Sequence, residues 1–170
     1  MDSLRTKKRI ALDCEMVDVG TNLRRDIVAR VSLVDEHLQC VYDKYVKPTK
    51  TVTDYRTAIT GITKLKLERE GIDFNIVQRD VKRLIAGCVV VGHSLDYDFK
   101  VLNLDHPDED VIDTSRIDPF KSLTNKGHTP GLKFLAQRFL NVNIQQGQHS
   151  SITDAKVAMK LSLMAIPKRQ

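Results

Sequence analysis

The sequence predicts an α/β domain with a mixed central β-sheet flanked by α-helices. Runs rich in β-branched residues come first in the chain of 170 residues, and segments with helical spacing follow them. A short, wholly apolar run at 88–91 (CVVV) then indicates a strand that is covered on both faces. Because a helix followed by a buried strand indicates a crossover connection, we expect helices packed on the faces of one mixed sheet.

The first strands are expected from alternation of apolar and polar residues. Along Arg9 to Val17, apolar side chains fill one face, whereas Asp13 and Glu15 fall together on the other. The runs Val28 to Val34 and Leu38 to Val46 are separated by a short polar segment, as in an antiparallel meander. We therefore expect antiparallel strands in the N-terminal part of the sheet.

Helical spacing predicts the elements of the second half. Apolar residues in 74–85 recur with the period of a helix, and Asp73 is a suitable N-cap. The last helix is expected over 151–165, where Ser151 and Asp154 resemble a capping box. The other expected elements are a helix at 95–102, a brief strand at 111–113 and a helix that starts at Pro130 and ends at Asn141.

The formal net charge of +5 is concentrated at the two ends of the chain. Residues 10–167 sum to zero, so we expect basic tails at 1–8 and 167–170 on either side of one folded domain at 9–166. Basic ends steer a chain toward nucleic acid or a membrane surface, or they are simply solvated. Charge alone therefore does not identify the partner.

Composition excludes several other classes of protein. No stretch approaches the ~20 apolar residues of a bilayer span, and charge stands near the N-terminus where a signal peptide needs an apolar run. We therefore expect an intracellular protein without a membrane partner. Cys14, Cys40 and Cys88 are widely spaced, which predicts reduced thiols rather than a disulfide framework or a zinc site.

Asp13 and Glu15 are the most informative pair of residues in the sequence. Carboxylates on one face of an otherwise apolar strand are costly to desolvate unless a cation compensates them. Hard divalent metals prefer such oxygen ligands, so the pair indicates a metal site. The alternative is that this face meets solvent and the two acids are ordinary surface groups.

Two further segments carry side chains suited to catalysis. Asp98 follows the buried strand 88–91, at the end where open α/β sheets bind ligands, although compensation of a helix dipole is an alternative. His149 precedes the last expected helix and Asp154 lies near its start; a surface histidine and a capping acid are the alternatives. Because imidazole is suited to deprotonating water near neutral pH, four acids and one histidine together indicate phosphodiester hydrolysis with two divalent ions.

An ordered series of motifs runs along the chain from about Arg9 to Met164. The segments are A-L-D-C-E-M-V, Y-D-K-Y-V-K-P, D-Y-R-T-A-I-T-G-I-T, V-V-V-G-H-S-L-D-Y-D-F-K-V-L, D-T-S-R, T-P-G-L-K-F-L-A and H-S-S-I-T-D-A-K-V-A-M. In this order they resemble the DEDDh exonucleases of the ribonuclease H-like fold, which are named for four acids and a histidine. The resemblance is to the small eukaryotic group that includes the RNA exonuclease 4 family and the interferon-induced exonuclease.

The resemblance implies a reaction and a role for each candidate residue. His149 would be the general base, and the ligands of two divalent metal ions, Mg²⁺ or Mn²⁺, would be Asp13, Glu15, Asp98 and Asp154. The implied reaction is hydrolysis of single-stranded RNA from a free 3′ end to nucleoside 5′-monophosphates. A 3′ to 5′ DNA exonuclease and a non-catalytic nucleic-acid-binding module are the alternatives. The group also suggests a location in the nucleus or nucleolus, with the cytoplasm as the alternative.

Met16 and Arg56 are the expected substrate contacts. Met16 would pack on the terminal nucleoside if the strand bends or ends there, because strict alternation points it away from Glu15; core packing is its alternative. Arg56 would hydrogen-bond ribose or phosphate, and a surface salt bridge with Asp54 is its alternative.

The chain departs from the group's usual pattern at Asp96 and Tyr97, where His-Asn is common. The additional carboxylate either tunes metal affinity or faces solvent. The acidic run at 105–110 lacks the glycine and closing glutamate of a calcium loop, so we expect a solvated loop there.

The expected metal ligands also change the meaning of the net charge. With their carboxylates compensated by divalent ions, the body of the chain becomes positively charged. RNA binding is therefore expected to need divalent metal as well as low salt.

Overall fold

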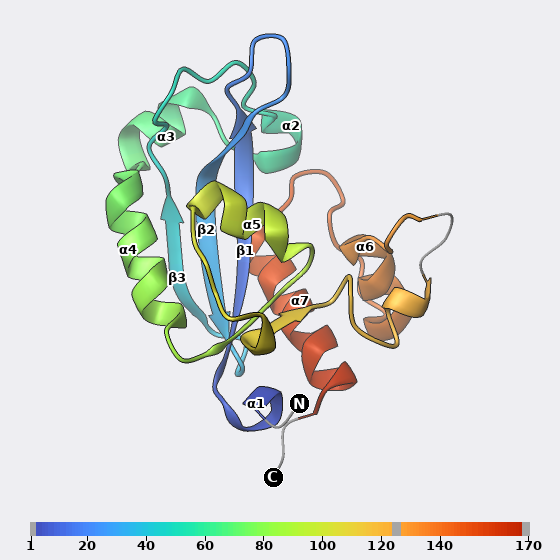
Figure 1. Ribbon diagram of the computed structural model, residues 1–170. Coiled ribbons are helices and arrows are strands. Elements are labelled where there is room, and N and C mark those ends of the chain that lie inside the picture. Colours follow the sequence, from blue (N-terminus) through green and yellow to red (C-terminus); the bar gives the residue numbers. More distant parts are fainter. Residues whose placement is uncertain (1–2, 124–126, 168–170) are drawn as a thin grey trace.

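The computed structural model describes residues 3–123 and 127–167, which are built around a five-stranded sheet of order β3-β2-β1-β4-β5 (Figure 1). The strands are β1 (Arg9–Asp18), β2 (Asp26–Asp35), β3 (Cys40–Tyr45), β4 (Val89–Gly92) and β5 (Val111–Asp113). Pairing is antiparallel between β1 and β2 and between β2 and β3, whereas β1 with β4 and β4 with β5 are parallel. The predicted mixed sheet with an antiparallel N-terminal part is confirmed.

Helices connect and cover these strands. They are α1 (Ser3–Thr6), α2 (Thr57–Thr60), α3 (Lys64–Glu70), α4 (Phe74–Ile85), α5 (Leu95–Leu102), α6 (Leu132–Leu135) and α7 (Ser151–Ala165), with a π-helical turn at Ala136–Leu140 and 3-10 turns at Asp108–Asp110 and Lys121–Leu123. The expected helices α4, α5 and α7 are confirmed, whereas α2 and α3 were not expected. No helix in the described ranges has the length and apolar character needed to cross a membrane.

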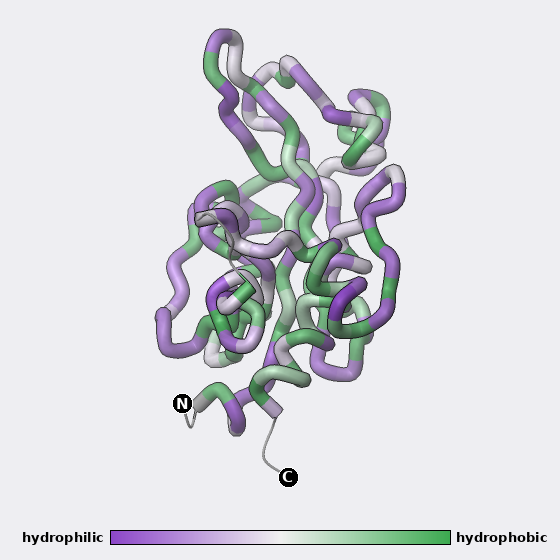
Figure 2. The backbone as a smooth tube through the Cα atoms, turned by 90° about the vertical axis from the view of Figure 1, so that its right-hand side faces the viewer, coloured by the Kyte–Doolittle hydropathy of each residue, from purple (hydrophilic) through white to green (hydrophobic). Residues whose placement is uncertain are grey.

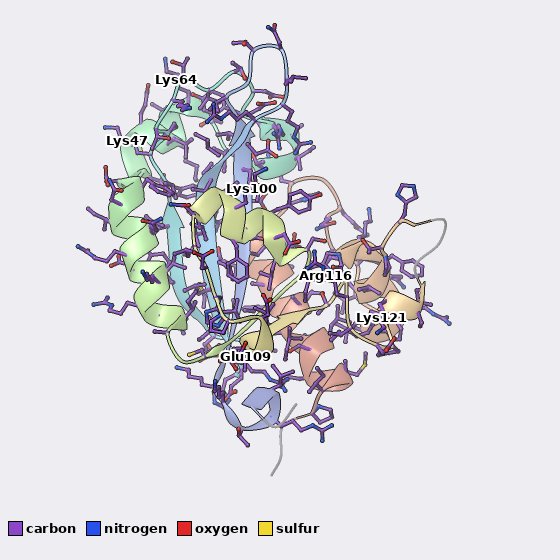
Figure 3. The ribbon with its side chains drawn as sticks, viewed as in Figure 1. Lys47, Lys64, Lys100, Glu109, Arg116 and Lys121 are labelled. Carbon is purple, nitrogen blue, oxygen red and sulfur yellow. The ribbon has the colours of Figure 1, made fainter. Side chains whose placement is uncertain are left out.

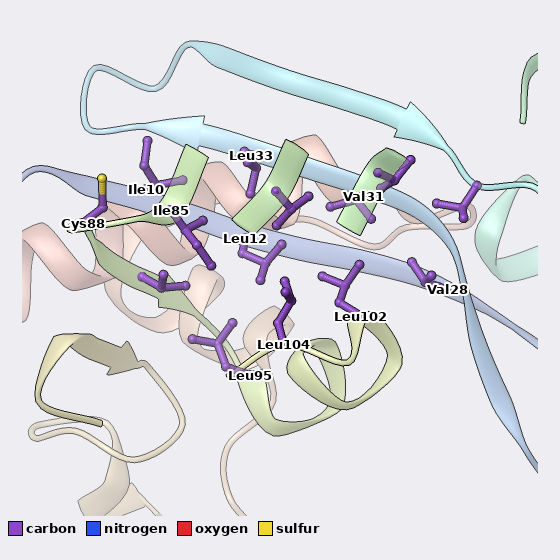
Figure 4. Packing of buried hydrophobic residues seen from close by; sticks show 14 residues of the cluster. Ile10, Leu12, Val28, Val31, Leu33, Ile85, Cys88, Leu95, Leu102 and Leu104 are labelled. Atoms are coloured by element: carbon purple, nitrogen blue, oxygen red, sulfur yellow. The ribbon is translucent and has the colours of Figure 1, made fainter. Parts of the chain in front are cut away.

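The two faces of the sheet are covered by different helices. On one face, α4 and α5 pack against β1, and Figure 4 shows Leu95 and Leu102 of α5 in the same apolar layer as Leu12 of β1. On the other face, α7 packs against the sheet through Ala155, Ala158 and Met159. Along the backbone tube of Figure 2, hydrophobic stretches gather in the interior, and the outer loops are mostly hydrophilic. The sheet therefore forms the middle of three layers.

The start of α7 differs from the capping box expected at Ser151 and Asp154. Ser150 is the N-cap, and its hydroxyl accepts a hydrogen bond of 3.5 Å from the backbone N–H of Thr153. The hydroxyl of Ser151 is buried and lies 2.7 Å from the hydroxyl of Ser32 on β2. Because the hydroxyl of Ser150 serves as the cap, the carboxylate of Asp154 is not engaged at the helix end.

Arg9 joins the two ends of the described chain. Its guanidinium is fully buried and donates hydrogen bonds to the carbonyl oxygens of Leu4 at 2.8 Å, Ser162 at 3.3 Å and Ile166 at 2.5 Å. Burial lowers the pKa of Arg9. The segment expected as an N-terminal tail includes α1, and Leu4 packs against the apolar layer under α7. One of the N-terminal cations is thus part of the interior rather than of the surface.

Candidate active site

A crevice forms where β1 and β4 separate. The pairing of β1 with β4 extends from Arg9 to Ala11, and after Gly92 the chain turns into α5. A Cβ at Gly92 would lie 2.3 Å from the side chain of Leu95 and 3.0 Å from the carbonyl oxygen of Leu12, so this close approach requires glycine. From β1 the chain continues to β2 on one side of the sheet, whereas from β4 it continues through α5 to β5 on the other side. The crevice between β1 and β4 is therefore at the kind of switch point where α/β sheets bind ligands.

Three carboxylates meet on the face of β1 that α7 covers. One oxygen from each of Asp13, Glu15 and Asp154 lies within 4.8 Å of the others. Glu15 and Asp154 are only 7% and 5% exposed, and Asp13 is half-buried. The prediction that Asp13 and Glu15 share one face is confirmed, and the alternative of an ordinary solvated face is wrong.

Asp98 approaches the same strand from α5. Its Oδ1 accepts a hydrogen bond of 2.8 Å from the backbone N–H of Cys14, the residue between the two β1 acids. The carboxylate is 5% exposed, and its charge contributes to the raised pKa of Asp13. The structure therefore brings Asp98 to the acidic cluster from the opposite side of the crevice.

Burial raises the pKa of every carboxyl group in this set, and the charges of neighbouring acids of the set add to the shift at Asp13 and Glu15. Burial, reinforced by the charge of Asp154, raises the pKa of Glu15 to about 7. Burial raises the pKa of Asp98 to about 7, although hydrogen bonds from Cys14 oppose the shift. Burial and then the charge of Asp98 hold the pKa of Asp13 well above its usual range. A nearby cation would remove this repulsion and allow the whole set to ionise at neutral pH.

The two oxygens of Asp154 differ in their partners. Oδ2 accepts a hydrogen bond of 2.8 Å from the side-chain amide of Gln145. Oδ1 is buried and, within the described ranges, has no hydrogen-bond partner. An unsatisfied buried carboxylate oxygen is costly, and a cation would satisfy it. Oxygen donors alone are the set that Mg²⁺ and Mn²⁺ prefer, so the residues present fit divalent metal ions.

His149 lies in the loop that leads into α7. Its backbone N–H donates a hydrogen bond of 2.6 Å to the carbonyl oxygen of Ile59 in α2, and its side chain is half-buried. The imidazole is near enough to Asp154 that its charge lowers the pKa of that acid, against the larger effect of burial. The structure therefore places His149 beside the acidic cluster.

Met16 lines the crevice beside an irregularity in the strand pairing. The register between β1 and β2 shifts there, so that Glu15 pairs with Arg30 and Met16 pairs with Val28. Met16 and Asp13 line the same cleft, of about 940 Å³. The strand does not end at Met16, because β1 continues to Asp18, and the extra residue at the register shift, Ala29, lies on β2.

Arg56 forms its ion pair with a different acid from the one expected. Its backbone N–H donates to Asp54 at 2.8 Å, but its guanidinium binds the carboxylate of Asp26 on β2 and lies 4.0 Å from Asp18. The expected alternative, a salt bridge with Asp54, is therefore wrong. The backbone of Arg56 has a positive φ of 47°, which is uncommon for a residue other than glycine.

Two other expectations about acidic residues are resolved by the structure. Asp96 is exposed and pairs with Arg116, so its carboxylate faces solvent. In the run 105–110, Asp110 is buried and forms an ion pair with Lys7, and residues 108–110 form a 3-10 turn. The expectation of a wholly solvated loop is therefore wrong at Asp110.

Sequence analysis missed two residues that support the site. Gln145 holds Asp154, and the polar stretch before His149 was its only sequence signal. Asp113 accepts hydrogen bonds from the backbone N–H groups of Ser94 at 2.8 Å and Leu95 at 2.9 Å, and thereby fixes the start of α5. The motif D-T-S-R contains Asp113, but its role depends on a contact across the sheet that the sequence does not show.

The fold and the acidic crevice together define a nuclease domain of the ribonuclease H-like class. The chain belongs to the Exonuclease family (RNase_T), which matches residues 10–162. The resemblance inferred from the ordered motifs is thereby confirmed, and a metal-dependent family fits the cluster of carboxylates.

Named relatives agree with this assignment. RNA exonuclease 4 of Mus musculus is 48% identical over 157 residues, covering 92% of this chain and 36% of the relative, and that of Homo sapiens is 46% identical over 157 residues, covering 92% and 37%. The Saccharomyces cerevisiae Pan2 pseudoubiquitin hydrolase-RNA exonuclease module in complex with A7 RNA is 31% identical with a TM-score of 0.80, covering 92% of this chain and 28% of that chain. The chain thus spans little more than a third of the curated relatives' length.

Proposed function

We propose that this domain is a metal-dependent 3′ to 5′ exoribonuclease that shortens single-stranded RNA to nucleoside 5′-monophosphates. The observation that carries the proposal is the convergence of Asp13, Glu15 and Asp154 within 4.8 Å, with Asp98 held against the same strand. The RNA exonuclease names of the relatives and the A7 RNA of the Pan2 structure support RNA as the substrate.

The four carboxylates are the proposed ligands of two divalent ions, Mg²⁺ or Mn²⁺. When bound, such ions compensate phosphate charge and acidify water. The chain contributes a rigid set of oxygen ligands, because Asp13 and Glu15 lie on the central strand and Asp98 and Asp154 lie on helices packed against its two faces. The unpartnered Oδ1 of Asp154 supports a direct ligand role for that residue.

His149 is the proposed general base. Its backbone is fixed to α2 through the carbonyl oxygen of Ile59, while its imidazole lies near Asp154 and half-exposed to solvent. An imidazole in this position accepts the proton of the attacking water near neutral pH. The proposal predicts that His149 contributes to the rate rather than to metal binding.

Met16 and Arg56 are the proposed contacts of the terminal nucleotide. Met16 lines the cleft next to Asp13, so its flexible thioether is placed to pack on a nucleoside. Arg56 is held by Asp26, which lines the same cleft, so a sugar or phosphate would have to compete with that carboxylate or share the guanidinium. Of the two contacts, the structure supports Met16 more directly.

The test is digestion of a 5′-labelled single-stranded RNA with Mg²⁺ or Mn²⁺. We expect stepwise shortening from the 3′ end, release of 5′-monophosphates and arrest by a chelator. Asp98→Asn should abolish shortening, whereas the matched change Asp96→Asn, two residues earlier on the exposed side of α5, should retain it. Binding without shortening would favour a non-catalytic module, and equal or faster digestion of DNA of the same sequence would contradict the RNA preference.

A second experiment separates the roles of His149 and the acids. Calorimetric titration with Mn²⁺ should show binding by His149→Ala and loss of binding by Asp13→Ala, while both variants lose activity. His37→Ala, at an exposed turn between β2 and β3, is the matched histidine control. The reverse order of metal affinities would overturn the assignment of base and ligands.

A further inference from the structure

The cleft at the acidic cluster continues beyond the proposed metal ligands. Asp13 and Asp98 line one end of this cleft. The loop between β1 and β2 and the helix α5 line the rest of it. The residues of this extension are Arg24, Arg25, Tyr97, Lys100 and Val101. A volume of about 940 Å³ is more than one nucleotide needs, so the cleft has room for the strand upstream of the 3′ end.

Tyr97 presents an aromatic ring to solvent at this cleft. It is 66% exposed, although a large aromatic side chain is usually buried. Its neighbour Asp98 points inward to β1, because successive residues of a helix face directions about 100° apart. Tyr97 lines the same cleft as Arg24 and Arg25 of the β1–β2 loop.

The charge on the extension is positive, in contrast to the acidic end. Arg25 and Lys100 are exposed, and neither forms an ion pair within the described ranges. The side chain of Arg24 is also exposed, but its guanidinium forms an ion pair of 3.0 Å with the carboxylate of Asp26. Figure 3 shows Lys100 on α5, away from Arg116, the cation that pairs with Asp96. Asp96 does not line the cleft; it is paired with Arg116 in a neighbouring hollow that Lys100 also borders.

We propose that Tyr97, Arg25 and Lys100 form a subsite for the nucleotides upstream of the terminal one, in which a base stacks on Tyr97 and phosphates bind the two cations. An aromatic platform flanked by cations is the combination that binds unpaired nucleic acid. Because stacking needs a base whose face is free, the subsite selects single-stranded substrate. The inference rests on the proposed exonuclease function and adds to it a determinant of strand binding.

The test compares a dinucleotide with an octanucleotide of RNA that share the same 3′ end. Tyr97→Ala should raise KM for the octanucleotide about tenfold with little change in kcat, because stacking is lost, and should leave the dinucleotide unaffected. Tyr97→Phe should retain the wild-type KM. Phe134→Ala removes an aromatic ring that is 51% exposed on α6, outside the cleft, and serves as the matched control.

Abasic substitutions in the octanucleotide identify the stacked base. One upstream abasic position should reproduce the KM increase in the wild-type protein and add nothing further in Tyr97→Ala. Lys100→Ala and Arg25→Ala should each reduce the salt dependence of binding. Equal KM for Tyr97→Ala and Tyr97→Phe on both substrates would overturn the subsite.

A direct binding measurement tests the subsite independently of the proposed exonuclease activity. If the wild-type protein shortens no RNA, the exonuclease proposal fails, and anisotropy of a labelled octanucleotide then tests the subsite alone. Weaker binding by Tyr97→Ala than by Tyr97→Phe would still support it, and equal binding would exclude it. Thermal unfolding of each variant should match wild type, since the ring is exposed.

Discussion

The side-chain amide of Gln145 donates a 2.8 Å hydrogen bond to Oδ2 of Asp154 and leaves Oδ1 of that carboxylate buried without a hydrogen-bond partner among the described residues. The backbone of Gln145 has a positive φ of 55°, a conformation that is uncommon outside glycine. The surrounding fold therefore holds the backbone of Gln145 in an uncommon conformation while its amide binds the acid. Gln145 acts on the site by orienting Asp154.

Removal of this amide should lower the affinity for the activating metal ion more than it lowers the free energy of unfolding. We expect Gln145→Ala to raise the Mg²⁺ or Mn²⁺ concentration at half-maximal activity about tenfold, since loss of a partner that orients a ligand typically costs that much in metal affinity. At saturating metal, kcat should recover toward wild type. The neighbouring exposed residue provides the control Gln146→Ala. Identical metal titrations of the two variants would exclude this positioning role.

The raised pKa values near 7 of Glu15 and Asp98 predict a stability that falls with pH in the metal-free protein. These groups keep their protons in the folded state where the unfolded chain has already lost them, so folding is favoured at low pH and weakened as pH rises from about 4 through 7. For Glu15, the change from 4.5 to about 7 corresponds to on the order of 3 kcal/mol. We expect a higher unfolding midpoint near pH 5.5 than near pH 8.

Mg²⁺ should restore the unfolding midpoint near pH 8, because bound cations replace the protons. Glu15→Gln should flatten the pH dependence, whereas Asp96→Asn, at an exposed acid, should not. Asp26 and Asp43 have lowered pKa values, so they become protonated, and change the free energy of unfolding, only at pH values below this range. A metal-free protein that is most stable near pH 8 would contradict the raised pKa values of Glu15 and Asp98.

Arg9 should be one of the most sensitive positions for stability outside the active site. Arg9→Met would leave the carbonyl oxygens of Leu4 and Ile166 without the guanidinium donor and would remove one of the two donors to Ser162, and we expect a loss of roughly 2–4 kcal/mol in the free energy of unfolding. Lys8→Met changes an exposed neighbour and should cost little. Chemical denaturation measures both, and equal midpoints would show that the buried guanidinium is not needed.

Local patterns in the sequence predicted the elements that carry the site, because strand alternation and helical periodicity are properties of neighbouring residues. Asp13 and Glu15 share a face for this reason. The hydrogen bond between Gln145 and Asp154 and the burial of Arg9 were not predictable, since each depends on how distant segments pack. The α7 cap was misplaced by one residue because Ser150 and Ser151 are chemically identical, and only the contact with Ser32 distinguishes them.

Divalent metal should control RNA affinity as well as turnover. At a pH above the pKa of about 7 that Glu15 and Asp98 have without metal, carboxylates at the cleft repel phosphate, and the N-terminal cations offset this only in part, because Arg9 is buried and Lys7 pairs with Asp110. We therefore expect anisotropy of a labelled RNA to show weak binding in chelator and stronger, salt-sensitive binding with Mn²⁺.

Neutralising two of these acids should replace part of the metal's effect on binding. At the same pH, Asp13→Asn combined with Asp98→Asn should bind RNA in chelator more tightly than wild type while remaining inactive, because the repulsion from ionised carboxylates is removed together with two ligands. Asp96→Asn, whose carboxylate pairs with Arg116, should bind as wild type does. If the double variant and wild type bind equally in chelator, the acidic cluster is not what limits binding, and affinity then depends on the cations of the cleft alone.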